Sequence, residues 1–124
     1  RTLALAGTLL TDVGLHSLAA FPGLADLDLS DTRVTGVGLR SVGMLASLES
    51  LNLEGTDIHD AGLVHLGELP RLRRLYLGRT QVTDKGLDLL RRVSGVTFVD
   101  LALCPRVTEE GIRGLQEAGV MVSH

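Results

Sequence analysis

The sequence has few aromatic residues, one cysteine and no long apolar run, and each shortage excludes a class of protein. Of its 124 residues only Phe21, Tyr76 and Phe98 are aromatic, whereas nucleic-acid binding commonly relies on stacking aromatics. Cys104 has no second cysteine to pair with, so the chain requires no oxidising compartment. No run of about 18 apolar residues occurs, so the sequence indicates no membrane span.

A large excess of one charge sign is also missing. Twelve basic and 15 acidic residues give a formal net charge of −3. A nucleic-acid partner would require a basic face, so none is expected. Hydrophobic residues make up 44% of the chain, which excludes disorder caused by too little apolar burial. The length fits one domain over residues 1–124, and because the chain begins at Arg1 rather than Met we expect it to be part of a longer native protein.

What the sequence does contain is an internal repeat of 24 residues. Leu24, Leu48, Leu72 and Val96 begin successive copies at this spacing. The copies occupy approximately residues 1–23, 24–47, 48–71, 72–95 and 96–119, with a closing half-repeat at 120–124. The segment TDKG (83–86) recurs as TDVG, TGVG, HDAG and TEEG, and an enzyme rarely needs its active site five times. We therefore interpret TDKG as scaffold rather than as a catalytic site.

Each copy predicts a strand, a turn and a short helix. The pattern LxxLxL alternates apolar and polar residues as a half-buried strand does, and GLxxLxxL has helical spacing. Threonine hydroxyls are predicted to cap the helices at Thr11, Thr35, Thr83 and Thr108. The acidic residues that follow favour the positive helix N-terminus, and they are Asp12, Asp60, Asp84 and Glu109. The second copy has glycine in this place, so we expect it to be the weak point.

Three further columns recur at the same period. The glycines predict that neighbouring helices approach too closely for a β-carbon, at Gly14, Gly38, Gly62, Gly86 and Gly111. A second column predicts a ladder of small polar groups bonded to the backbone of adjacent turns, at Thr8, Thr32, Thr56, Thr80 and Cys104. We predict that the Cys104 thiol is buried. Phe21 shares a column with Leu45 and Leu69, so we predict that it lies in the core.

The motif LxLxxTxVTDxGLxxL resembles the leucine-rich repeat family over essentially the whole chain. In the last copy LALCPRVTEEGI (101–112) has cysteine where the others have threonine, which resembles the cysteine-containing class of F-box substrate receptors, bacterial relatives and ribonuclease-inhibitor-like proteins. The resemblance implies an α/β fold, a right-handed solenoid or horseshoe of about five repeats. Parallel strands would line its concave face and short helices its convex face.

The residues between the strand leucines are predicted to lie on the concave face. There the register places Tyr76 and Phe98 on adjacent strands, with Arg74 beside Phe98, and tyrosine and arginine are enriched at binding hot spots. Acidic residues next to this cluster predict a basic segment in the partner. The candidate binding residues are Arg74, Tyr76, Phe98, Asp100, Asn52, Glu54, Asp28 and Asp26. Alternatively, the aromatics pack only across strands, or Arg74 covers Phe98 as an internal cation–π pair.

The sequence favours a binding module over an enzyme. No Ser–His–Asp or Cys–His arrangement fits the predicted columns, and the four histidines lie in different columns, so we expect no catalysis, cofactor or metal. The first hypothesis is a non-catalytic scaffold for a protein or peptide partner, in the cytoplasm. The alternative is the substrate-recognition region of an F-box-type ubiquitin ligase or a secreted bacterial effector. The first repeat has no cap, which leaves self-association open.

Overall fold

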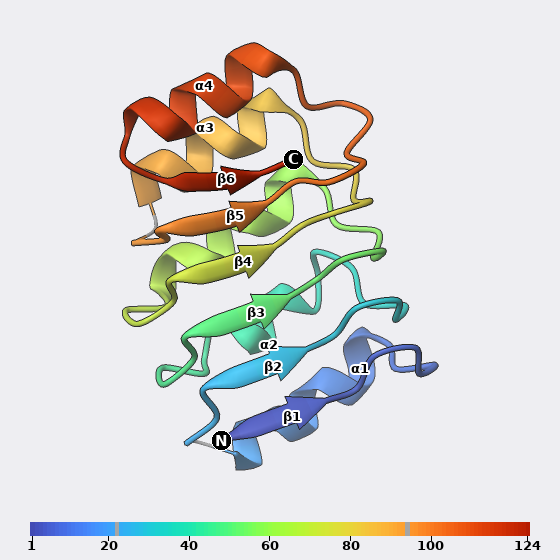
Figure 1. Cartoon of the computed structure of the whole chain (residues 1–124). Coiled ribbons are helices and arrows are strands. Elements are labelled where there is room, and N and C mark those ends of the chain that lie inside the picture. The colour runs from blue at the N-terminus through green and yellow to red at the C-terminus, as the bar shows by residue number, and fades with distance from the viewer. Residues whose placement is uncertain (22, 94) are drawn as a thin grey trace.

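Six parallel strands of three residues each form one sheet in chain order, as the computed structural model in Figure 1 shows. Residues 1–21, 23–93 and 95–124 are described. The strands are β1 (Thr2–Ala4), β2 (Asp26–Asp28), β3 (Ser50–Asn52), β4 (Arg74–Tyr76), β5 (Phe98–Asp100) and β6 (Met121–Ser123). Residues 120–124, predicted to form a closing half-repeat, contain the last strand of the sheet.

The register of the sheet follows the 24-residue spacing. The central residues Leu27, Leu51, Leu75 and Val99 lie in line across β2 to β5 and are buried. Flanking residues point to the opposite face, because successive side chains alternate along a strand. The predicted neighbours are found: Arg74 pairs with Phe98, and Tyr76 lies between Asn52 and Asp100.

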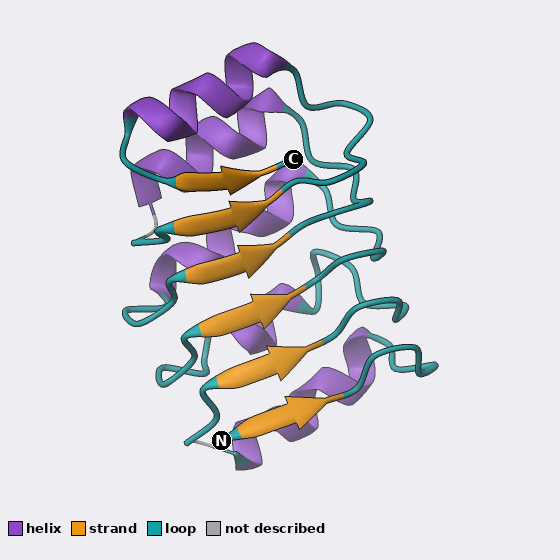
Figure 2. Cartoon of the chain, viewed as in Figure 1, coloured by secondary structure: helices purple, strands orange, loops and turns teal. Residues whose placement is uncertain are grey.

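Helices cover one face of the sheet (Figure 2), and the core of leucines lies between the two layers. They are α1 (Asp12–Leu15), η1 (His16–Ala20), α2 (Leu39–Val42), η2 (Asp60–Glu68), α3 (Asp84–Val93) and α4 (Glu109–Glu117). The opposite face carries no helix among the described residues, and we call it the open face. In the same part of the chain, no helix combines the length and apolar character needed to cross a membrane.

Carboxylates link three of the turns to the following turn at the start of the helices. In three places an aspartate accepts hydrogen bonds from both the backbone N–H and the hydroxyl of a threonine in the following turn. Their N···O and O···O distances are 2.7 and 2.5 Å for Asp12–Thr35, 2.7 and 2.5 Å for Asp60–Thr83, and 2.9 and 2.5 Å for Asp84–Thr108. These aspartates therefore link successive turns, a role that the helix-dipole argument missed.

The predicted threonine caps are confirmed only in part. The hydroxyls of Thr11 and Thr108 make no cap hydrogen bond. The hydroxyl of Thr83 accepts from the backbone N–H two residues on at 3.2 Å, as a cap does, whereas that of Thr35 accepts an equivalent bond at 3.3 Å ahead of α2. The hydroxyls of three of these residues, Thr35, Thr83 and Thr108, also donate to the aspartate of the preceding turn.

The glycine column leaves room for these carboxylates. A β-carbon added at Gly38, Gly86 or Gly111 would lie 2.2–2.3 Å from Oδ1 of the aspartate in the preceding turn. Where Gly36 replaces that aspartate, between α2 and η2, a β-carbon on Gly62 would lie 2.7 Å from the Cα of Gly36. The predicted close approach is confirmed here, but a side chain rather than a helix backbone fills most of these spaces.

The predicted ladder between adjacent turns is wrong for the threonines. Their hydroxyls donate, at 2.5–2.8 Å, to the carbonyl three residues earlier in their own turn, and the pairs are Thr8–Leu5, Thr32–Leu29, Thr56–Leu53 and Thr80–Leu77. Only the last step of the column joins adjacent turns among the described contacts: Sγ of Cys104 donates to the Leu77 carbonyl at 3.0 Å and lies 3.9 Å from Oγ1 of Thr80. Its thiol is half-buried rather than buried.

Phe21 is not a core residue. Its side chain is 44% exposed, whereas Leu45 and Leu69 in the same column are 2% and 3% exposed. Phe21 belongs to the first copy of the repeat, which has a neighbouring copy on one side only, so fewer side chains pack against it. The alignment with Leu45 and Leu69 did not take into account that no copy of the repeat precedes the first one in this chain.

Candidate functional site

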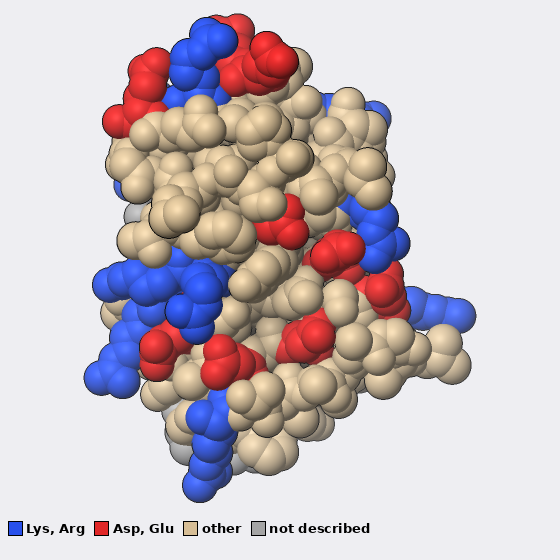
Figure 3. All heavy atoms as spheres, viewed as in Figure 1, with Lys and Arg blue, Asp and Glu red and all other residues tan. Residues whose placement is uncertain are grey.

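The eight predicted binding residues all lie on the open face or directly after its strands. Asp26 and Asp28 are on β2, Asn52 on β3 with Glu54 just after it, Arg74 and Tyr76 on β4, and Phe98 and Asp100 on β5. Arg74 is exposed and the other seven are half-buried. The structure therefore brings these residues onto one surface. The charged atoms of this surface lie mainly over β2 to β4 and at the edges of the open face (Figure 3).

An apolar strip crosses β4, β5 and β6. The rings of Tyr76 and Phe98 pack against each other with centroids 5.5 Å apart and planes tilted by 58°. Met121 pairs with Phe98 in the β5–β6 register, and its side chain is 71% exposed. The surface over β5 and β6 is mostly uncharged (Figure 3). We call Tyr76, Phe98 and Met121 the apolar strip, and the sequence analysis missed its third member.

Arg74 turns away from the aromatic rings. Its Nη2 lies 3.6 Å from Oδ1 of Asp26, so the guanidinium reaches across β3 to β2. No cation–π contact joins Arg74 to Phe98 in the described part of the structure, so this alternative is wrong. Cross-strand packing is observed for the two rings, and the exposed Met121 extends it beyond an internal pair.

A second arginine, which the sequence analysis missed, bridges two turns at the edge of the open face. Nη2 of Arg79 lies 3.1 Å from Oδ1 of Asp31 and 3.2 Å from Oε1 of Glu54. Hydrogen bonds to Glu54 and then Asp31 raise the pKa of the Arg79 guanidinium above its usual range. The guanidinium crosses Gly55, whose φ is +71° and where a β-carbon would lie 2.2 Å from Oδ1 of Asp31. A side chain at Gly55 would therefore displace the ion pairs that Arg79 forms with Asp31 and Glu54.

Asp28, Asn52 and Asp100 share a local structural role. In each, Oδ1 accepts from the backbone N–H two residues on, at 2.9 Å for Asp28, 2.9 Å for Asn52 and 3.0 Å for Asp100. Short polar side chains commonly fold onto the backbone in this way and fix the turn that follows. Turn formation therefore explains part of the polarity of these three positions, and no described residue hydrogen-bonds to Oδ2 of Asp28 or Asp100.

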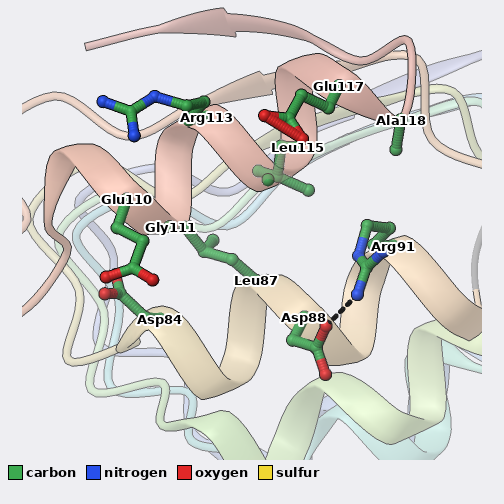
Figure 4. A pocket seen from close by; sticks show the side chains of 11 residues that line it. Asp84, Leu87, Asp88, Arg91, Glu110, Gly111, Arg113, Leu115, Glu117 and Ala118 are labelled. Carbon is green, nitrogen blue, oxygen red and sulfur yellow. Dashed lines mark hydrogen bonds and ion pairs between the residues drawn. The ribbon is translucent and has the colours of Figure 1, made fainter.

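A groove of about 820 Å³ lies away from these residues, between α3 and α4 (Figure 4). Leu87, Gly111 and Leu115 contribute to its lining, together with charged side chains of both helices. Within it Arg91 donates to Asp88 on the same helix, and this bond is the main reason that the pKa of Asp88 lies below its usual range. The acidic and basic groups neutralise each other along one helix, which is typical of a solvated helix surface.

The described residues bring no candidate metal site together. No group of three histidine, cysteine, aspartate or glutamate side chains within them could hold a metal ion. His59 instead contacts Asp57 at 3.0 Å, two residues away in the same loop. Ser41 lies 3.4 Å from Nδ1 of His16. These are isolated surface contacts.

Comparison with known families agrees with this geometry. Residues 1–58 match the family model described as leucine rich repeat. This match and the six-stranded parallel sheet support a leucine-rich repeat protein. Leucine-rich repeat domains are generally protein-interaction modules and are typically non-enzymatic. A search of curated proteins finds no match to the chain.

Proposed function

We propose that this chain is a non-catalytic interaction domain that binds a protein or peptide on its open face. In this proposal residues 1–124 form a right-handed solenoid of about five 24-residue repeats, closed by 120–124, and the open face is its concave side. Leucine-rich repeats use one scaffold for many partners, so the function must be argued from the surface itself.

The observation that carries the proposal is the apolar strip. Three large side chains lie together on a sheet face over which no described helix packs, and Met121 is largely exposed. Complete burial of such a side chain stabilises a complex by about 1.5–3 kcal/mol. The backbone hydrogen bonds of the sheet hold the strip in place, so binding would order few groups and would lose little conformational entropy.

The size of the open face sets the kind of partner. Neighbouring strands lie about 4.8 Å apart, so six strands span roughly 24 Å. This width accommodates an extended peptide or one side of a helix. A large globular partner would have to extend onto the loop edges, where Arg79 bridges Asp31 and Glu54.

Truncation of the apolar strip tests this proposal. Peptides selected against the domain from a random displayed library would be titrated by calorimetry against Tyr76→Ala and Phe98→Ala variants. We expect each substitution to weaken binding about thirtyfold, as hot-spot residues do. Arg74→Glu should weaken binding less, because Arg74 mainly neutralises Asp26.

Val37→Ala is the matched control for this experiment. Val37 is as exposed as Met121 but lies beside α2, on the helix side of the sheet. Its truncation should leave affinity unchanged. Peptides that bind Tyr76→Ala and Phe98→Ala as tightly as the parent protein would move the interaction surface away from the open face.

The narrower proposal is a substrate-recognition region of an F-box-type ubiquitin ligase or a secreted effector. Cys104 supports it, because this residue carries the resemblance to the cysteine-containing class and hydrogen-bonds to the neighbouring turn. A segment of F-box type encoded in the same gene would support the ligase, and a secretion signal would support the effector. The general interaction domain, in the cytoplasm, is our primary proposal.

A further inference from the structure

The acidic residues of the open face fall into two groups. Asp26 forms an ion pair with Arg74, whereas Asp31 and Glu54 share Arg79, whose single charge offsets one of the two. Asp28 and Asp100 form no ion pair with any described residue. Part of the acidic charge of this face is therefore offset internally, and Asp28 and Asp100 are its carboxylates without a described ion-pair partner.

Asp28 and Asp100 lie in one row across the strands. The register aligns Asp28 with Asn52, Asn52 with Tyr76, and Tyr76 with Asp100. With strands about 4.8 Å apart, the two carboxylates are separated by roughly 14 Å. The row thus presents an acid, an amide, a phenol and a second acid, and Phe98 adjoins its last two members.

Each of the two carboxylates is oriented by the turn that follows it. Oδ1 of Asp28 accepts from both the N–H and the hydroxyl of Ser30, at 2.9 and 2.6 Å, and Oδ1 of Asp100 accepts from the N–H of Ala102 at 3.0 Å. These bonds fix the side chains and leave Oδ2 as the acceptor for an external donor. A fixed, half-buried carboxylate loses little entropy when it binds a cation.

We propose that the partner is a segment with two basic side chains about 14 Å apart that contact Asp28 and Asp100, and with a large apolar side chain on the apolar strip. In an extended chain, at about 3.3 Å per residue, this separation corresponds to basic residues roughly four positions apart. Positions separated by an even number lie on the same side of an extended peptide, so both can face the sheet. This inference rests on the proposed function and specifies the partner that the open face selects.

The test removes the two charges without removing the turns. Asn52 occupies the same row and its amide oxygen accepts the equivalent backbone bond at 2.9 Å, so asparagine fits this position. In Asp28→Asn with Asp100→Asn, we expect library-selected peptides to bind at least tenfold more weakly than to the parent protein. Glu110→Gln with Glu117→Gln on α4 is the control, because it changes net charge equally on the helix side.

The peptides themselves provide an independent measurement on the unaltered domain. Selected peptides should be enriched in pairs of lysine or arginine at the stated spacing, together with an aliphatic or aromatic residue. Replacing one lysine with glutamine in such a peptide should weaken binding, and added salt should weaken the parent peptide more than the substituted one. This arm remains decisive even if the double asparagine variant folds poorly.

The outcomes separate this inference from the proposed function. Peptides that depend on Tyr76 and Phe98 but have no basic pairs, and that bind the asparagine variant normally, would overturn the charge inference alone. Peptides indifferent to the apolar strip and to both aspartates would overturn the proposed function as well. Loss of binding in the asparagine variant and in the lysine-substituted peptides, with the α4 control unchanged, would support the inference.

Discussion

Gly62→Ala should destabilise the protein by about 3 kcal/mol, because its new methyl group has no space between two backbones. The β-carbon would lie 2.7 Å from the Cα of Gly36 and 3.4 Å from Cδ1 of Leu39. The nearer atom is backbone, so it cannot move aside by a rotamer change, and α2 and η2 would have to separate. The free energy of unfolding in urea, measured by circular dichroism, gives the effect.

Gly114→Ala is the control for this substitution. Gly114 lies within α4, and a β-carbon there would meet no atom within 4 Å. Alanine in a helix interior is favoured over glycine by about 0.5–1 kcal/mol, so this variant should be more stable than the parent protein. If the free energy of unfolding changes equally in Gly62→Ala and Gly114→Ala, helix propensity rather than close approach of the backbones determines the effect of replacing Gly62.

Asp60→Ala is expected to destabilise the protein by about 2–3 kcal/mol, since it removes the acceptor that joins η2 to the next turn. The carboxylate accepts from the N–H of Thr83 at 2.7 Å and from its hydroxyl at 2.5 Å. Without it, both donors lose their partner at a half-buried position, and the space above Gly86 is left unfilled. Asp60→Asn should cost less, because an amide keeps one acceptor and can donate to the threonine hydroxyl.

Asp57→Ala provides the comparison for Asp60→Ala. Asp57 lies three residues earlier, and its side chain is exposed and contacts only the exposed His59 among the described side chains. Its removal should change stability by less than about 0.5 kcal/mol. If the two alanine variants unfold at the same urea concentration, the carboxylate does not link the turns as the geometry indicates.

The strands and their register could be predicted from the sequence because one period controls both. When each copy has 24 residues, the same strand position returns in every turn, and parallel pairing follows without knowledge of side-chain contacts. The helices were less predictable. α2 has four residues, in a segment with glycine at positions 36, 38 and 43, and η2 is a 3-10 helix, whereas α3 has ten residues.

In the candidate site, only the contacts that follow from the pairing of adjacent strands could be predicted from the sequence. The contact between Tyr76 and Phe98 follows from adjacent strands. The pairing of Arg74 with Asp26 does not, because the side chain crosses an intervening strand and its direction is decided by charge. Met121 was missed for a different reason: it follows Phe98 by 23 residues rather than 24, so the periodic alignment did not include it.

The glycine at position 36 gives the sheet an asymmetric junction. On the helix side no carboxylate of the described residues joins α2 to η2 by a hydrogen bond, and on the strand side Arg74 and Arg79 reach back over β3 to Asp26 and Asp31. The two layers are therefore joined differently at this one junction: direct backbone approach of Gly36 and Gly62 on the helix side, and long ion pairs added to the β2–β3 pairing on the strand side.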